Sequence, residues 1–380
     1  KFASEKYFRH EITAQELTGI AADLRHRHWI TQVAAGIDFV PCNDFSFYDI
    51  VLDTAVLLGI VPKRYRELNV SKLDTYFAMA RGYQGESGDV KALAMKKWFN
   101  TNYHYIVPEI EDDTVISLDC EKLTGEYEET KKLGIKTKPV VTGPYTMLKL
   151  CRYVGSKNAE DLADDVAEAY RQLIAECTDK NVEWLQFDEP SLVRDMDDDD
   201  KALFHRVYYR VFADHVGCKI LLQTYFGDVR DVYEDIINMP FAGIGLDFIE
   251  GRQTGELINR YGFPGDKVLF AGLVNGKNIW RNHYDKTLKI IRQLRDKKIN
   301  VVLSTSCSLL HVPYTLKHET KLSQDYLRFF AFAEEKLTEL SELATLAERY
   351  NYTELEAYHK NQELFAGTRD CNSNEVRQRL

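Results

Sequence analysis

Cys307 and His311 are the two side chains whose types and spacing most directly suggest chemistry. They lie four residues apart in "VVLSTSCSLLHVPYTL" (301–316), close to one helical turn, after a run typical of a buried strand. A cysteine and a histidine so placed could bind a metal or act as nucleophile and base. Zinc needs three or four such ligands, however, and the apolar neighbours of His311 favour a packed loop.

Asp188 and Glu189, followed by Pro190, form the second candidate group. Two carboxylates at a strand end could act as general acid or base, or could bind a substrate amine. In the alternative, one carboxylate caps the next helix and the other bonds a neighbouring strand. The residues alone favour this structural alternative. His104, flanked by aromatic residues in "NTNYHYIVP", is expected in a hydrogen-bonded core.

Basic side chains gather in "ARGYQGESGDVKALAMKKWFN" (80–100), together with glycine-rich turns and a tryptophan. This segment could bind a ligand rich in carboxylates over an aromatic surface. A solvated helix face explains the composition equally well. The basic candidates in the chain are Lys1, Arg81, Lys91, Lys96 and Lys97.

Eight short apolar runs, rich in β-branched and aromatic residues, alternate with amphipathic stretches. They lack strict polar alternation, as expected of strands covered on both faces. The repeated units predict a parallel sheet with right-handed crossovers, and no G-x-G-x-x-G or Walker loop supports a nucleotide-binding sheet. We therefore expect a (βα)8 TIM-type barrel with insertions. The runs are 36–41, 104–110, 138–144, 182–190, 219–227, 243–251, 267–276 and 300–308.

The carboxyl ends of barrel strands meet at one mouth, where catalytic residues of this fold class lie. The expected polar residues there are Asp44, Asp188, Glu189, Thr224, Asp247, Asn275, Ser306 and Cys307.

Helix signals support the same organisation. Thr13 and Glu16 have the spacing of a capping box, and Asn158 can cap a second helix. Cys177 falls on the apolar stripe of that second helix and is expected to be a core residue. One long helix is expected over 322–348 and a shorter one to about 365, with a polar linker after it.

Composition narrows the class of partner. The 380 residues carry a net charge of −10, which argues against nucleic acid or an anionic membrane as the main partner. No apolar run approaches the roughly 18 residues of a membrane helix. The seven cysteines form no C-x-x-C pair, as expected of reduced thiols in a cytoplasmic protein. Because the chain begins at Lys1, we expect a fragment or a processed form.

Seven strings follow one another along the chain: "GIDFVPCNDFSFYDIVLDTAVLLGIVPKRY", "MKKWFNTNYHYIVPEI", "KPVVTGPYTML", "FDEPSLV", "TYFGDV", "GLVNGKNIW" and "SCSLLHVP". Taken in this order, they resemble the N-terminal half of cobalamin-independent methionine synthase. The resemblance implies a methyltransferase that moves a methyl group from 5-methyltetrahydropteroyl-polyglutamate to homocysteine. It implies two barrels, of which the C-terminal one holds zinc and homocysteine and the N-terminal one helps to bind the anionic folate tail. No cobalamin is implied.

The resemblance also implies residue roles. Lys1 is similar to the last residue of the family's Arg-Glu-Leu-Lys folate-binding segment, and Lys97 matches its other N-terminal folate-contacting lysine. Lys96 and Arg81 are secondary candidates for the same tail, and no catalytic residue is implied in this half.

The zinc ligands of the family's other barrel are a His-x-Cys pair, a Glu and a Cys. They correspond here to Thr224-x-Phe226, Asp247 and Cys307. Two ligands are thus replaced, so we expect Cys307 to be the relic of a metal site and this chain to bind no zinc.

Two departures from the family shape the expected architecture. The zinc-bearing half is absent, so residues 1–350 are expected to form the N-terminal barrel and 351–380 a helix and linker toward the missing half. The family's Gly-Phe-Pro-Arg segment, its first strand, would lie before Lys1. Either 104–110 is then an accessory strand and the barrel lacks a member, or the strands are arranged differently.

Two rival interpretations remain. One is a stand-alone methyltransferase- or decarboxylase-like barrel that uses Asp188, Glu189 and Cys307. The other is a non-catalytic binding barrel.

Overall fold

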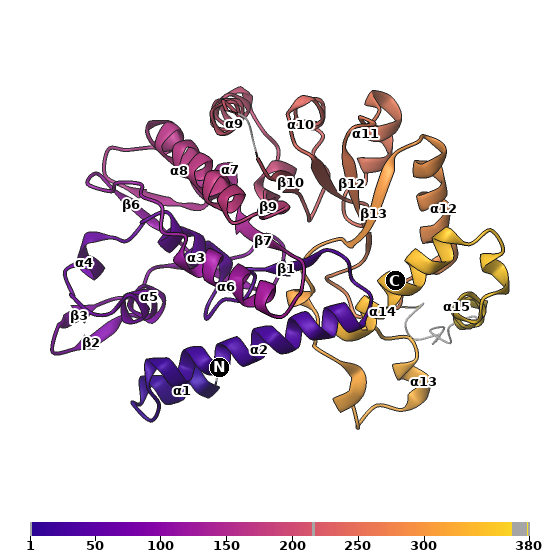
Figure 1. Ribbon diagram of the computed structural model, residues 1–380, viewed down its shortest axis with the longest axis horizontal. Coiled ribbons are helices and arrows are strands. Elements are labelled where there is room, and N and C mark those ends of the chain that lie inside the picture. The colour runs from indigo at the N-terminus through magenta and orange to yellow at the C-terminus, as the bar shows by residue number, and fades with distance from the viewer. Residues whose placement is uncertain (1, 215–216, 367–377, 379–380) are drawn as a thin grey trace.

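A seven-stranded parallel sheet forms the centre of the protein. The computed structural model describes residues 2–214, 217–366 and 378 (Figure 1). The strand order is β1-β7-β9-β10-β11-β12-β13, and every neighbouring pair is parallel. The strands are β1 (Val40–Cys42), β7 (Thr137–Thr142), β9 (Trp184–Asp188), β10 (Lys219–Gln223), β11 (Gly243–Asp247), β12 (Val268–Val274) and β13 (Asn300–Thr305).

Helices connect successive strands and cover the outer face of the sheet, as parallel pairing requires. In Figure 1, helices α8 to α12 follow one another along one side of the curled sheet. The result is a TIM-like half-barrel of the α/β class. The helices of the half-barrel are α3 (Ile50–Leu57), α6 (Glu121–Lys132), α7 (Pro144–Leu150), α8 (Ala159–Asp179), α9 (Asp198–Val211), α10 (Tyr233–Asn238), α11 (Thr254–Tyr261), α12 (Tyr284–Asp296) and α14 (Ala333–Glu348).

Seven of the eight apolar runs form this sheet, and the run 104–110 does not. It forms β5 (His104–Ile106) and β6 (Glu109–Glu111), which pair with β4 (Met95–Lys97) and β8 (Arg152–Val154) in separate two-stranded sheets. Pro108 lies between β5 and β6 and cannot donate to a strand ladder. The accessory-strand alternative is therefore confirmed, and the sheet has seven strands where the full barrel has eight.

The remaining elements lie before and within the first connections. Helix α2 (Ala14–Ala34) is the long helix along the lower side of Figure 1. The others are α1 (Phe2–Phe8), α4 (Lys63–Arg66), α5 (Lys72–Arg81), β2 (Tyr83–Gly85), β3 (Gly88–Val90), α13 (Gln324–Leu327) and α15 (Glu356–Ala366).

The two margins of the sheet differ. Pro41 in β1 has no N–H to donate, and its carbonyl oxygen accepts a hydrogen bond from the Trp29 indole at 3.1 Å. At the other margin, β13 pairs with β12 alone within the described residues, and Val301, Val302 and Leu303 are only partly buried. The β1 margin is thus covered by side chains, and the β13 margin is less so.

An aromatic layer fills the inner face of the sheet near the amino ends of the strands. Phe39, Trp184 and Phe270 contact one another edge to face, with ring centroids 5.0 to 5.8 Å apart. Gly243 lies in the same layer, where an added Cβ would come within 2.9 Å of Phe270 and Trp184. This end of the sheet is therefore packed with apolar side chains, and the polar residues lie at the opposite, carboxyl ends of the strands.

The helix signals are confirmed. Thr13 and Glu16 form a capping box at α2, and Asn158 forms one with Asp161 at α8. Cys177 is fully buried on α8. The single helix expected over 322–348 is wrong, because a turn and the bridge residue Phe330 separate α13 from α14. No helix in the described ranges is long and apolar enough to cross a membrane.

Candidate functional site

Glu189 is a buried cap for a neighbouring helix. Its carboxylate accepts hydrogen bonds from the backbone N–H groups of Tyr145 (3.0 Å) and Thr146 (2.7 Å), in the first turn of α7, and from the Tyr208 hydroxyl (2.6 Å). Burial raises the pKa of Glu189 to about 7, although these hydrogen bonds oppose the rise. Glu189 therefore caps a helix, as the structural alternative predicted. The capped helix is α7, which precedes β9, and not the helix that follows β9.

Asp188 points from the end of β9 toward the next strand. It accepts hydrogen bonds from Gln186 Nε2 (2.7 Å) and the Tyr225 hydroxyl (3.2 Å). Burial raises its pKa to about 6, while the Gln186 hydrogen bond and the nearby Lys138 act in the opposite direction. Lys138 also contacts Gln186 and therefore belongs to this cluster. The sequence pattern did not single out this lysine. Both carboxylates are thus held by protein groups.

Asp247 is held by the backbone. Oδ2 accepts from the Phe226 N–H (2.9 Å), and Oδ1 accepts from the N–H groups of Ile249 (2.7 Å) and Glu250 (3.0 Å). Burial raises its pKa to about 6 against the effect of these three hydrogen bonds. Thr224 is also internal, since its hydroxyl donates to the Gly245 carbonyl at 2.8 Å.

Cys307 and His311 do not form a reactive pair. Cys307 is 5% exposed, and burial raises the pKa of its thiol to about 12, so it is a neutral thiol at physiological pH. The pKa of His311 falls to about 4, first through burial and then through the charge of Lys277. The imidazole packs against the rings of Phe226 (5.5 Å) and Tyr103 (6.2 Å). The packed-loop interpretation therefore describes this segment.

The other expected mouth residues lie at strand ends and mostly shape turns. Asn275 Oδ1 accepts from the N–H groups of Lys277 (2.8 Å) and Asn278 (2.9 Å), and Ser306 Oγ accepts from the Gly276 N–H (3.2 Å). Asp44 follows β1 and is exposed.

These strand ends do not fit a zinc site. Thr224 and Phe226 have no side chain of the kind that usually binds zinc, and both oxygens of Asp247 accept hydrogen bonds from backbone N–H groups. In the described ranges no group of three His, Cys, Asp or Glu side chains could hold a metal ion. The absence of zinc stays a prediction.

Lys97 is an exposed residue of the β4–β5 hairpin. It lies opposite His104, and Lys96 lies opposite Tyr105. Cross-strand partners share a face and successive residues alternate, so the two lysines point to opposite faces. Tyr105 is 5% exposed and belongs to the core, whereas Lys96, Lys97 and His104 are all exposed. The core position expected for His104 is therefore wrong.

The other basic candidates are dispersed. Arg81, at the end of α5, lies over the Phe8 ring at 3.7 Å and is thus engaged with α1. Lys91 is exposed in the loop before β4. Lys1 lies outside the described residues.

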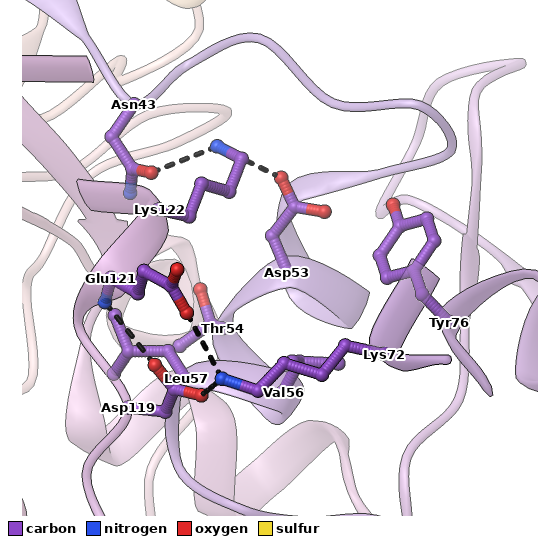
Figure 2. Close-up of a pocket in the computed structure, with 10 residues that line it drawn as sticks. All are labelled: Asn43, Asp53, Thr54, Val56, Leu57, Lys72, Tyr76, Asp119, Glu121 and Lys122. Carbon is purple, nitrogen blue, oxygen red and sulfur yellow. Dashed lines mark hydrogen bonds and ion pairs between the residues drawn. The ribbon is translucent and has the colours of Figure 1, made fainter. Parts of the chain in front are cut away.

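A pocket of about 300 Å³ lies among α3, α5 and α6 (Figure 2). Lys122 contacts Asn43 Oδ1 (2.8 Å) and Asp53 Oδ2 (3.3 Å). Lys72 contacts Asp119 at 2.8 Å and also pairs with Glu121, as Figure 2 shows. Because each lysine is already paired with carboxylates of the pocket, this pocket offers no free charge to a ligand.

The open polar mouth of a curled parallel sheet defines an α/β protein of the TIM-barrel type. Comparison with known proteins makes this more specific. Residues 1–299 match the family model described as cobalamin-independent synthase, N-terminal domain. The chain belongs to the cobalamin-independent methionine synthase family.

Curated relatives match along the whole chain. The 5-methyltetrahydropteroyltriglutamate–homocysteine methyltransferases of Lactococcus lactis subsp. lactis (strain IL1403) and Streptococcus thermophilus (strain ATCC BAA-491 / LMD-9) are each 50% identical over 380 residues. The match covers 100% of this chain and 50% of each relative. The chain thus spans about half the length of these enzymes.

Solved structures show the same fold at low sequence identity. A putative vitamin-B12 independent methionine synthase from Listeria monocytogenes aligns with a TM-score of 0.62 at 16% identity, covering 91% of both chains. A B12-independent methionine synthase from Shewanella sp. W3-18-1 aligns with a TM-score of 0.60 at 16% identity, covering 88% of this chain and 90% of that one.

Proposed function

We propose that this chain is the N-terminal, folate-tail-binding half of a methyltransferase. The whole enzyme moves a methyl group from 5-methyltetrahydropteroyl-polyglutamate to homocysteine and forms methionine. The observation that carries the proposal is the 50% identity, along the entire chain, to enzymes named for this reaction. Residues 1–350 would form the barrel unit and 351–380 the connection toward the second half.

Lys97 is the residue we assign to the anionic tail. A polyglutamate tail carries several carboxylates, and a lysine attracts them as a point charge. The chain as a whole has a net charge of −10, so an anionic ligand needs a local cation that the protein's own carboxylates do not neutralise. Lys97 is exposed and forms no ion pair in the part of the chain that the structure describes. Lys1 would act beside it, with Lys96 and Arg81 as secondary contributors.

The reacting groups would belong to the other half of the enzyme. Zinc bound there would lower the pKa of the homocysteine thiol and present a thiolate to the methyl donor. In this chain, Asp188, Glu189 and Cys307 are each occupied or neutralised by protein contacts, and we assign none of them a catalytic role. The chain would bind and orient the folate tail.

Turnover by the purified chain tests the proposal. The 380-residue polypeptide, supplied with homocysteine, zinc and 5-methyltetrahydropteroyl-triglutamate, should form no methionine. A covalent extension that restores the second half, built on a relative's sequence, should form it. Methionine production by the chain alone would refute the proposed division of labour.

A further inference from the structure

A second pocket opens at the mouth of the half-barrel, where the β4–β5 hairpin meets the loops that follow the central strands. Its volume is about 330 Å³, and it is lined by Phe99, Asn100, Val193, Arg194 and Phe226. Phe99 and Asn100 belong to the hairpin loop, Arg194 follows β9, and Phe226 follows β10. The pocket lies at the end of the fold where α/β barrels bind their ligands.

Two aromatic rings form the apolar surface of this pocket. Phe99 and Phe226 lie with ring centroids 5.8 Å apart and planes inclined by 43°. Both have left-handed backbones, with φ of 50° for Phe99 and 73° for Phe226. A bulky side chain rarely adopts this conformation, and such strain concentrates at ligand sites. Asp247 helps to hold Phe226 in place through its backbone N–H.

Arg194 supplies an available positive charge beside these rings. Its guanidinium carbon lies 4.6 Å from the centre of the Phe99 ring, and the side chain is exposed. The adjacent Asp195 pairs with Arg230 instead, at 3.4 Å. Within the residues that the structure describes, Arg194 forms no ion pair. Its planar fork of donors is suited to a carboxylate.

The opposite rim of the pocket is electrically balanced. Lys277 Nζ lies 2.6 Å from Glu250 Oε1 and 3.0 Å from Asn100 Oδ1, and Asn100 also donates to Glu250 at 2.8 Å. These contacts tie the hairpin loop to the loops after β11 and β12. The net charge facing the pocket is therefore that of Arg194, which favours a ligand with one nearby anionic group.

We propose that this pocket binds a planar aromatic ring that is joined to a nearby carboxylate. The ring lies against Phe99 and Phe226, and the carboxylate accepts from the Arg194 guanidinium. If the proposed function holds, this ring and carboxylate are the 4-aminobenzoyl-glutamate portion of the folate. Lys97 is two residues from Phe99, within about 7 Å along the chain, so later glutamates of the same ligand reach it.

Calorimetric titration of the 380-residue chain with 4-aminobenzoyl-glutamate tests this site. Free glutamate, which lacks the ring, should bind more weakly. Arg194→Met keeps the apolar stem and should weaken binding of 4-aminobenzoyl-glutamate about tenfold, as loss of a charge-assisted pair requires. Arg194→Lys should recover only part of the loss. The matched control is Arg252→Met, which removes an exposed arginine two residues from Glu250 and should leave binding unchanged.

The possible results distinguish a failure of the pocket from a failure of the proposed tail site at Lys97. Equal binding by the wild type and Arg194→Met, equal weakening by Arg194→Met and Arg252→Met, or no binding to the wild type overturns the pocket. A Lys97→Ala chain that binds 4-aminobenzoyl-triglutamate as tightly as the wild type overturns the tail site. If Arg194→Met still weakens the short ligand in that case, the pocket stands without the tail site.

Discussion

The backbone N–H of Phe226 donates to Asp247 Oδ2 at 2.9 Å, so a carboxylate at the end of β11 fixes the loop that follows β10. The other oxygen of Asp247 accepts from two amides of its own loop. The carboxylate of Asp247 thus organises the backbone of two neighbouring loops.

Asp247→Asn should destabilise the fold by about 1–3 kcal/mol, because a buried N–H loses its charged acceptor. The midpoint of urea unfolding would report the loss. Asp195→Asn is the control, since Asp195 is exposed and its pair with Arg230 is a surface contact. Equal unfolding midpoints for the wild type and Asp247→Asn would contradict the role described for Asp247.

Lys97→Ala should weaken binding of a triglutamate folate by about threefold to tenfold, since an exposed ion pair contributes up to ~1 kcal/mol or slightly more. The monoglutamate should be less affected. Lys297→Ala, which removes an exposed lysine that follows α12, is the control. The comparison requires dissociation constants for both tail lengths with each variant, and an equal effect on both lengths would remove Lys97 from the tail site.

Glu189 should make the fold less stable as the pH rises. Its pKa rises from 4.5 to about 7 in the folded state, so the folded protein binds more protons between these values. The corresponding stability is present below pH 4.5 and is lost by pH 7, with a magnitude of up to roughly 3 kcal/mol. Glu189→Gln should flatten this part of the curve of unfolding free energy against pH. An unchanged slope in the variant would argue against the raised pKa.

His311 should titrate near pH 4 and not near its ordinary value of 6.5. The folded state favours the neutral imidazole, so its contribution to stability is present above pH 6.5 and is lost as the pH falls toward 4. The ring-proton chemical shift would give the midpoint directly, and His311→Gln would assign the resonance. A midpoint near 6.5 would mean that the ring is more hydrated than its contacts with Phe226 and Tyr103 indicate.

A chelator should leave the stability of this chain unchanged. Among the residues that the structure describes, neither Asp247 nor Cys307 has the further ligands that zinc needs. Elemental analysis should find no stoichiometric zinc, and urea unfolding should coincide with and without EDTA. Stoichiometric zinc that disappears in Cys307→Ser would instead support the stand-alone metal enzyme.

The parallel sheet could be predicted from sequence because its strands are buried on both faces. Each such strand reads as a continuous apolar run. Two recognisable caps mark helices beside these runs, Thr13 before the first run and Asn158 between the third and the fourth. The run 104–110 has the same composition, and only its pairing partners show that it lies outside the sheet. The composition of a run thus indicates that it is a strand, but it does not indicate which strand it pairs with.

The break between α13 and α14 shows a tertiary contact overriding a helical pattern. Phe330 bridges to Trp280, and the Ala331 N–H donates to the Ile279 carbonyl at 2.7 Å. These partners are about fifty residues away in sequence, so local periodicity could not reveal them.

The pocket lined by Phe99, Arg194 and Phe226 could not be predicted from the sequence, because its residues are far apart along the chain. Three separate loops contribute Phe99, Arg194 and Phe226 to this pocket. The sequence does not indicate that a phenylalanine has a positive φ. Lys97 was found through the resemblance, whereas Arg194 became a candidate only when its neighbours in space were known. An arginine directly after "FDEPSLV" was the available signal.

The unequal margins of the sheet limit how copies of this chain can join. Pro41 and the Trp29 indole close one side to an incoming strand, while β13 has β12 as its one strand neighbour among the described residues. If two molecules met by strand addition, they would do so through β13 on both, related by a twofold axis. Such a pair would have no further open side, so growth would stop at two and could not continue into a fibre.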